Sequence, residues 1–211
     1  MEKKYSRKTL SALFLKQLTT IESRGASRNL LYHFRSQRDE VLQKAESLLF
    51  AKGDVPFLPV IPFTHRSYFD QMPMIEIDGK KGTNSNCQDC CIWNNTYYFH
   101  RKPWYIFKVN AGDPLQGESI DSYSGKLNSK GLRSLLPEEV ISLCLHTQPK
   151  DVSLYCRVPH SNPWSQTHLM IGEIPNAGLE SGLPGYGPTM YGLIGNLSSK
   201  RNYLRVPSCV I

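Results

Sequence analysis

The sequence predicts an α+β fold, with an N-terminal helical hairpin followed by a mixed or antiparallel sheet domain that contains one further well-signalled helix. Three observations predict this class. Over the first fifty residues, apolar side chains recur at spacings of three and four, the period of an amphipathic helix. From Gly53 onward, proline, glycine, aromatic and β-branched residues dominate, as in strands and turns. The 211 residues, 40% hydrophobic and 20% charged, are typical of a globular protein.

Two units are expected, a basic helical hairpin over residues 1–52 and an α+β domain of unknown function over residues 53–211. The first helix of the hairpin is predicted over residues 8–22, where the apolar residues share one side. These residues are Leu10, Leu13, Phe14, Leu18 and Ile21. Gly25 is suited to stop this helix and Ser27 to cap the next one. The second helix is expected over residues 28–51. Its apolar side carries Leu30, Leu31, Phe34, Val41, Leu42, Ala45, Leu48 and Leu49.

The α+β domain is predicted to contain one helix and several strands. The helix is expected over residues 137–147, because Pro137 suits the first helical position and Glu138 and Glu139 suit the positive end of the helix dipole. Strands are expected over residues 55–61, 74–77, 96–100, 104–109, 152–158 and 168–174. Seven glycines from Gly172 to Gly195, interleaved with prolines, indicate long ordered loops.

Five segments of this domain follow one another in a familiar order. They are residues 56–61 (Pro-Phe-Leu-Pro-Val-Ile), 79–82 (Gly-Lys-Lys-Gly), 103–112, 131–143 and the terminal Ser208-Cys209. Their order and texture resemble a bacterial family of unknown function, the domain-of-unknown-function family five-seven-zero-one. The resemblance covers about residues 53–211 and implies a single α+β domain, without an activity to transfer. The chain departs from the family's pattern in the cysteine cluster at 87–91 and in a Gly/Pro/Tyr-rich stretch where a tryptophan-containing strand is expected.

Positive charge is concentrated in the hairpin. Residues 1–52 carry 11 Lys and Arg against 5 Asp and Glu, a net charge of +6 out of +7 for the chain. The candidate contact residues for nucleic acid or an acidic protein surface are Arg24, Arg28, Arg35 and Arg38. The alternative is an ordinary solvated helix face, on which Arg35 pairs with Asp39 four residues later.

The cysteine cluster is the most concrete candidate for a metal site. Two residues separate Cys87 from Cys90 in the chain, a gap that lets two thiolates of one turn bind the same zinc ion. His100 is the most suitable third ligand, and the sequence does not indicate the fourth. The same pattern is also typical of reduced thiols on a loop, and a redox pair is a further interpretation.

A polar cluster follows the first predicted strand. His65 and Asp70 could perform acid–base chemistry if the fold brings them together, whereas an ion pair between Arg66 and Asp70 would give the cluster a structural role. Cys144 and His146 lie two residues apart on the predicted helix, so their side chains diverge. We expect a core thiol and a surface or boundary histidine there.

Other classes of protein are not indicated. The glycine-rich stretch of residues 182–188 contains neither G-x-G-x-x-G nor a phosphate loop, so no nucleotide cofactor is expected. The longest apolar run is far shorter than the roughly 20 residues of a membrane span, and the basic start lacks the pattern of a signal peptide. A cytoplasmic location without a membrane partner is therefore expected.

Together these patterns predict a non-catalytic cytosolic binding or accessory protein that uses the basic helical hairpin to contact nucleic acid or an acidic protein partner. One alternative is a zinc-dependent hydrolase built on Cys87, Cys90 and His100, with His65 or Asp70 nearby. The other is a structural subunit of a larger complex. In that case the apolar stripe of the hairpin should be incompletely buried in the single chain.

Overall fold

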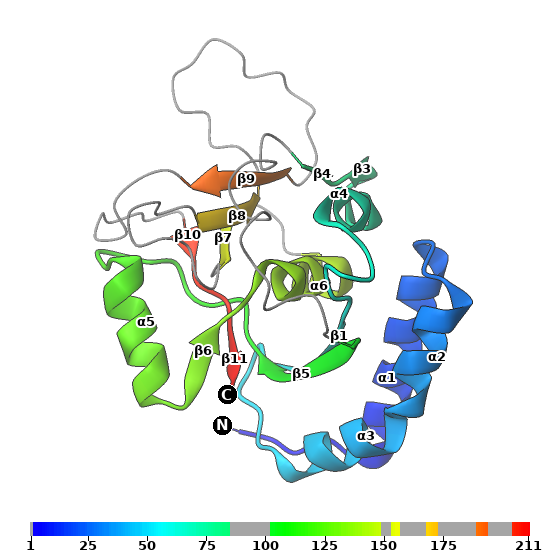
Figure 1. The fold of residues 1–211 in the computed structure, drawn as a ribbon. Helices are drawn as coiled ribbons and strands as arrows, with labels where there is room; N and C mark the ends of the chain where they lie inside the picture. Colours follow the sequence, from blue (N-terminus) through cyan, green and yellow to red (C-terminus); the bar gives the residue numbers. More distant parts are fainter. Residues whose placement is uncertain (1, 85–101, 149–152, 157–167, 173–188, 194–203) are drawn as a thin grey trace.

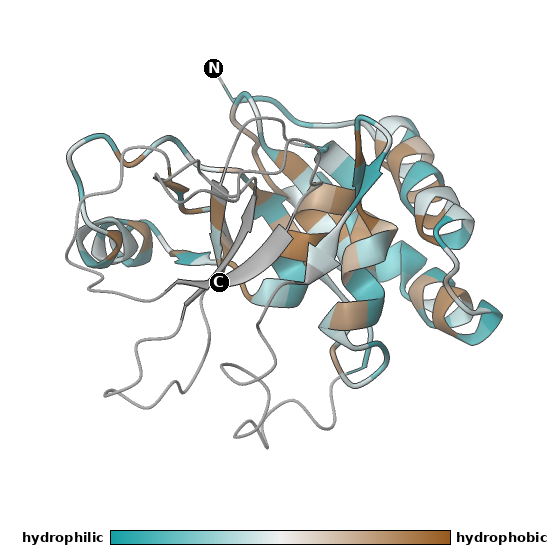
Figure 2. Cartoon of the chain, turned by 90° about the horizontal axis from the view of Figure 1, so that it is seen from above, coloured by the Kyte–Doolittle hydropathy of each residue, from teal (hydrophilic) through white to brown (hydrophobic). Residues whose placement is uncertain are grey.

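The computed structural model describes residues 2–84, 102–148, 153–156, 168–172, 189–193 and 204–211. Helices come first, and short strands alternate with helices in the remainder, so the predicted α+β class is confirmed. Figure 1 shows the N-terminal helices along one edge of the molecule and the largest sheet near the opposite edge. Apolar residues are concentrated on the central strands and helix, whereas the N-terminal helices carry both apolar and polar residues (Figure 2).

The N-terminal region contains three helices, α1 (Arg7–Ser23), α2 (Arg28–Ser36) and α3 (Arg38–Ser47). Ser27 caps α2 as predicted, because its hydroxyl accepts a hydrogen bond from the backbone N–H of Leu30. The prediction of one continuous helix over residues 28–51 is wrong. The backbone leaves helical geometry at Gln37, whose side-chain Nε2 donates to the carbonyl oxygens of His33 and Pro103 at 3.1 and 2.9 Å. A contact with a distant segment therefore accompanies the break.

A two-stranded antiparallel ribbon lies at the centre of the fold. It pairs β1 (Val55–Val60) with β5 (Trp104–Val109), close to the strands predicted there. Successive residues face opposite sides of a strand, and both sides of this ribbon are buried. Phe57 and Phe107 face the N-terminal helices, whereas Leu58 and Ile106 face the other core. Burial on both sides explains why these strands are almost continuously apolar.

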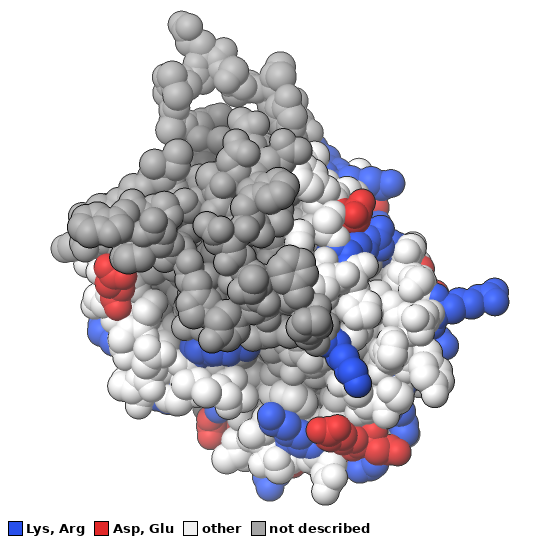
Figure 3. All heavy atoms as spheres, viewed as in Figure 1, with Lys and Arg blue, Asp and Glu red and all other residues white. Residues whose placement is uncertain are grey.

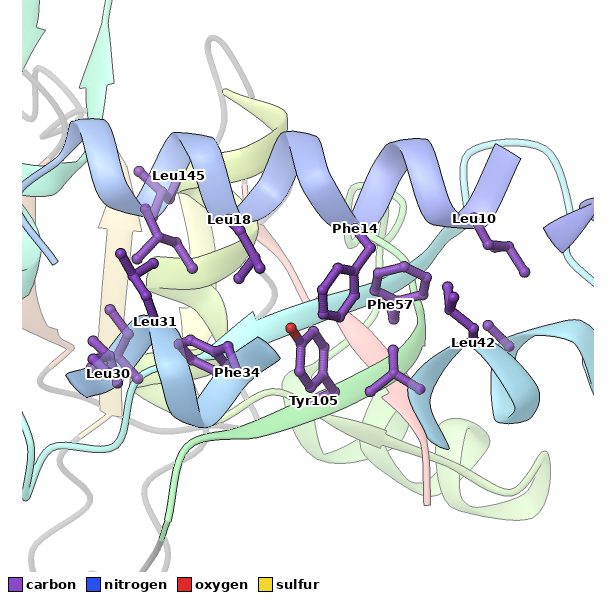
Figure 4. Close-up of a cluster of buried hydrophobic side chains, with 14 of the residues drawn as sticks. Leu10, Phe14, Leu18, Leu30, Leu31, Phe34, Leu42, Phe57, Tyr105 and Leu145 are labelled. Atoms are coloured by element: carbon purple, nitrogen blue, oxygen red, sulfur yellow. The ribbon is translucent and has the colours of Figure 1, made fainter. Parts of the chain in front are cut away.

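The N-terminal helices cover one side of the ribbon (Figure 4). Phe14 of α1 and Phe34 of α2 pack against Tyr105 of β5, with ring centroids 5.7 and 5.5 Å apart. Most of the apolar stripe is buried within the single chain, contrary to the expectation for a structural subunit: Leu10, Phe14, Ile21, Leu31 and Phe34 are at most 1% exposed. The exception is Leu49, which was predicted on the stripe but lies beyond the end of α3 and is 45% exposed. The boundary proposed between residues 52 and 53 is thus crossed by a shared hydrophobic core.

Helix α6 (Pro137–Thr147) covers the other side of the ribbon, with the bounds that the sequence predicted. Its N-terminus is held by Glu139, whose side chain accepts a hydrogen bond from the backbone N–H of Leu136 and a two-point ion pair from Arg133 at 2.6 and 2.7 Å. The Ser142 hydroxyl donates to the carbonyl oxygen of Pro59 at 2.6 Å, which ties α6 to β1.

The largest sheet has five strands in the order β10 (Leu204–Arg205), β7 (Ser153–Cys156), β8 (His168–Gly172), β9 (Thr189–Leu193) and β4 (Thr83–Asn84). The central pairs are antiparallel and the outer pairs parallel, so the sheet is mixed. Strands β7 and β8 lie within predicted segments, while β9 falls in the region predicted as loops. The predicted strand over residues 96–100 lies outside the described residues.

Smaller elements complete the described part of the chain. They are α4 (Tyr68–Gln71), η1 (Met72–Met74), α5 (Ile120–Ser129), and the antiparallel pairs β2 (Glu76–Ile77) with β3 (Lys80–Lys81) and β6 (Leu132–Ser134) with β11 (Ser208–Val210). The strand predicted over residues 74–77 is wrong at its start, because a turn of 3-10 helix occupies residues 72–74. Helix α5 was not predicted.

Candidate functional site

Two of the four arginines predicted to contact a partner are engaged within the chain by neighbouring carboxylates. Arg24 follows the last residue of α1 and pairs with Glu76 of β2. Arg38 Nη1 lies 3.3 Å from Asp39 Oδ1, and its Nη2 donates to the Ser11 hydroxyl at 3.2 Å. These contacts reduce the positive charge that either arginine can offer to a partner.

The other two arginines lie on the solvent side of α2. Arg35 Nη2 is 3.8 Å from Glu22 Oε2, and both side chains are more than half exposed. The expected pair between Arg35 and Asp39 is not formed, because the break at Gln37 moves Asp39 onto a separate helix. Arg28 is the first residue of α2 and is exposed. Among the residues that the structure describes, it has no carboxylate partner.

An exposed tyrosine lies between these two arginines. Arg28, Tyr32 and Arg35 are spaced by four and three residues and therefore share one side of α2, which we call the α2 face. The Tyr32 side chain is 68% exposed, the highest value among the exposed large hydrophobic residues of the N-terminal helices. The opposite side of α2 is buried in the core. The α2 face thus contributes little to the packing of the chain.

The predicted polar cluster after β1 forms a capped turn. Ser67 caps α4, and its hydroxyl donates to Asp70 Oδ2 at 2.6 Å. Arg66 Nη1 donates to the carbonyl oxygen of Gly25 at 3.2 Å. The expected ion pair between Arg66 and Asp70 is therefore wrong. Arg66 instead ties this loop to the turn between α1 and α2.

A polar cavity of about 370 Å³ lies between residues 25–27 and the loop of residues 63–67. His65 and Asp70 both line it, so the fold does bring these two predicted residues together. The Asp70 carboxylate is occupied by Ser67, and the His65 ring lies 6.4 Å from the ring of His33. Among the described residues no hydrogen bond or ion pair joins His65 to Asp70, so the two side chains line one cavity without forming a coupled acid–base pair.

The predicted zinc ligands Cys87, Cys90 and His100 lie outside the described residues, so the zinc site stays a prediction. Within the described ranges, no group of three or more His, Cys, Asp or Glu side chains is arranged to hold a metal ion. Cys144 is buried, and burial raises the pKa of its thiol to about 12, so it is the expected inert core thiol.

A second cavity, which the sequence did not reveal, lies between α1, the start of β1 and the end of α6. We call it the α1–α6 pocket. It measures about 300 Å³, and the residues around it are Tyr5, Thr9, Leu10, Leu13, Lys16, Gln17, Thr20, Asp54, Val55, Pro56, His146 and Thr147. Gln17 donates through Nε2 to the carbonyl oxygen of Phe57 at 2.7 Å. Its Oε1 and the Nε2 of His146 are both buried without a hydrogen-bond partner among the described residues.

His146 is electrically neutral at physiological pH. Burial, and then the positive charge of Lys16, lower the pKa of this imidazole to about 4. The residue lies at the edge of the core, as expected for a boundary histidine. One signal in the sequence did point to this region, since Gln17 is a polar residue within the apolar stripe of the first helix, three residues after Phe14.

No family model, curated protein or solved structure matches this chain. Among the described residues, no helix combines the length and the apolar character that crossing a membrane requires.

Proposed function

We propose that this chain is a non-catalytic cytosolic binding or accessory protein that contacts an acidic protein partner through the α2 face. The observation that carries the proposal is the exposure of Tyr32, 68%, between Arg28 and Arg35 on one side of a helix. Tyrosine and arginine are the residue types that most often supply binding energy at protein interfaces.

The packing of α2 supports this assignment. Leu30, Leu31 and Phe34 face the core and are at most 6% exposed, so the fold is stabilised by the opposite side of the helix. Covering an exposed tyrosine ring with a partner favours binding, by about 25 cal/mol for each Å² of apolar surface removed from water. The α2 face therefore combines apolar area with positive charge, and it contributes little to the packing of the fold.

An acidic protein fits the charge pattern better than nucleic acid. Binding to a phosphate backbone requires several cations free to replace counterions. Of the four arginines predicted to contact a partner, Arg24 and Arg38 are engaged by carboxylates, and Arg35 lies 3.8 Å from an exposed carboxylate of Glu22. On the face drawn in Figure 3, acidic side chains also lie next to basic ones along the lower edge. A mixed surface with one exposed aromatic side chain is typical of a protein contact.

The test is affinity purification of the full-length protein from extracts of its source cells, with and without nuclease, quantified by mass spectrometry. Wild type is compared with Tyr32→Ala, and with Lys8→Ala as a matched control on the exposed side of α1. We expect an acidic protein that wild type and Lys8→Ala retain and that Tyr32→Ala loses by about tenfold, as for an interface residue worth about 1.4 kcal/mol. Retention that is equal in all three proteins, or that disappears with nuclease, contradicts the proposal.

A further inference from the structure

The α1–α6 pocket has the composition of a small-molecule site. Its volume of about 300 Å³ is at the lower end of the range for ligand pockets. Leu10, Leu13, Val55 and Pro56 supply apolar walls, and a few polar residues line the same space. Apolar walls with a small number of polar groups are typical of sites that orient a small ligand. The pocket shares no residue with the α2 face.

One residue of the pocket holds a buried hydrogen-bond acceptor that is not satisfied. Gln17 is 2% exposed, and its Oε1 accepts no hydrogen bond from the described residues. The side-chain amide is fixed in this orientation, because Nε2 donates to the carbonyl oxygen of Phe57 at 2.7 Å. Leaving such an atom unpaired is costly, so a ligand that brings an N–H or O–H group to Oε1 gains free energy.

A second residue of the pocket holds another unpaired polar atom. The Nε2 of His146 is buried without a partner among the described residues. Since burial keeps this imidazole neutral, one of its two ring nitrogens carries a proton and the other is an acceptor. Nε2 therefore either donates or accepts one hydrogen bond. A ligand group that carries both a donor and an acceptor satisfies it in either form.

The charges around the pocket favour an uncharged ligand. Lys16 and Asp54 both line it, one positive and one negative. The Asp54 carboxylate accepts hydrogen bonds only from neutral groups in the described part of the chain, the backbone N–H of Ala51 at 2.7 Å and Asn110 Nδ2 at 2.8 Å. An ion of either sign therefore meets a like charge as well as an opposite one, and it loses hydration between apolar walls. A neutral molecule avoids both costs.

We propose that the α1–α6 pocket binds a small uncharged molecule with an apolar body and a primary amide group. One amide N–H donates to Gln17 Oε1, and the other N–H or the carbonyl oxygen pairs with His146 Nε2. The apolar body packs against Leu13 and Val55. Because both buried atoms are shielded from water, the ligand reaches them after a side chain of the pocket wall, such as the half-buried Leu13, changes its rotamer.

The test compares three molecules of nearly the same shape by NMR titration of isotope-labelled full-length protein. They are phenylacetamide, phenylacetone and phenylacetate, in which an amino group, a methyl group or a charged oxygen follows the same carbonyl carbon. We expect phenylacetamide to shift the backbone amide signals of α1 and α6 and to bind about tenfold more tightly than either analogue. If phenylacetamide does not bind up to about 10 mM, or if the ketone or the carboxylate binds equally well, the proposal is overturned.

Three variants locate the ligand within the chain. Leu13→Trp fills the pocket and should weaken phenylacetamide binding by about tenfold or more, whereas Leu15→Trp, on the same helix but 59% exposed and outside the pocket, should change it by less than about twofold. Equal affinities in these two variants would overturn the location. Gln17→Met removes the acceptor and should bring the affinities for amide and ketone to within about twofold of each other. This ratio is measured within one folded protein, and a preference for the amide that survives the substitution would contradict the role of Gln17.

Discussion

The α2 face and the α1–α6 pocket both present polar and charged groups, but in opposite environments. On the α2 face, Arg28, Tyr32 and Arg35 are exposed, and water can satisfy their polar atoms. In the pocket, Gln17 and His146 each hold a buried polar atom without a hydrogen-bond partner among the described residues. Groups satisfied by water contribute little to folding and are available to a partner, whereas buried groups affect stability directly. The comparison predicts which substitutions will change binding and which will change the fold.

The largest difference in stability is expected between the two sides of α2. Phe34→Ala should lower the free energy of unfolding by about 3–5 kcal/mol, because the ring is fully buried against Tyr105. Tyr32→Ala, two residues earlier on the exposed side, should change it by about 0.5 kcal/mol or less. Urea unfolding of both variants measures the two values. Similar losses in the two proteins would show that the α2 face is part of the core.

The pocket should make stability depend on pH. Because the pKa of His146 is lowered to about 4 from its ordinary value of 6.5, the unfolded chain takes up a proton at a higher pH than the folded chain. The contribution of neutral His146 to the stability of the folded chain is therefore present above pH 6.5 and is lost as the pH falls towards 4. Between pH 7 and pH 5, wild type should lose about 2 kcal/mol from this group.

His146→Gln provides the comparison for this pH effect. The variant lacks the imidazole, so its unfolding free energy should fall by about 2 kcal/mol less than that of wild type over the same pH interval. Urea unfolding at both pH values gives the difference directly. Parallel pH dependence in the two proteins would mean that the pKa of His146 is the same in the folded and the unfolded chain, which contradicts the burial of this imidazole.

The smallest effect is expected at the exposed ion pair of α2. Arg35 and Glu22 are more than half exposed and 3.8 Å apart, and such pairs contribute about 0–1 kcal/mol. Arg35→Ala should therefore change the urea midpoint only slightly, while it weakens partner binding. A loss of stability comparable with that of Phe34→Ala would contradict the assignment of this arginine to a contact surface.

The sequence predicted those elements of the fold whose ends are determined by neighbouring residues in the chain. Helix α6 has its predicted bounds, since Pro137 and Glu139 act at its N-terminus without help from distant residues other than Arg133. The break at Gln37 involves the carbonyl of Pro103, 66 residues away. The apolar periodicity around Gln37 therefore could not indicate that the helix ends there. Helix α5 was missed because serine, glycine and asparagine are poor helix formers and few of its residues are buried.

The candidate site was predictable only in part. Charge counting located the basic region, but the ion pairs of Arg24 and Arg38 depend on which elements the fold brings together. Tyr32 lies outside the apolar stripe, and its exposure follows from the packing of α2 on β5. The α1–α6 pocket joins residues from three separate elements, of which only Gln17 was unusual in its sequence context.

The most direct test of the central claim is site-specific photo-crosslinking in the source cells. A photoreactive amino acid replaces Asn29, which is exposed on α2 beside the α2 face, or Lys8, which is exposed on α1. We predict that the Asn29 position captures one acidic protein and that the Lys8 position does not. Identical products from both positions, or products that contain nucleic acid, would contradict the assignment of the α2 face as the binding surface for an acidic protein.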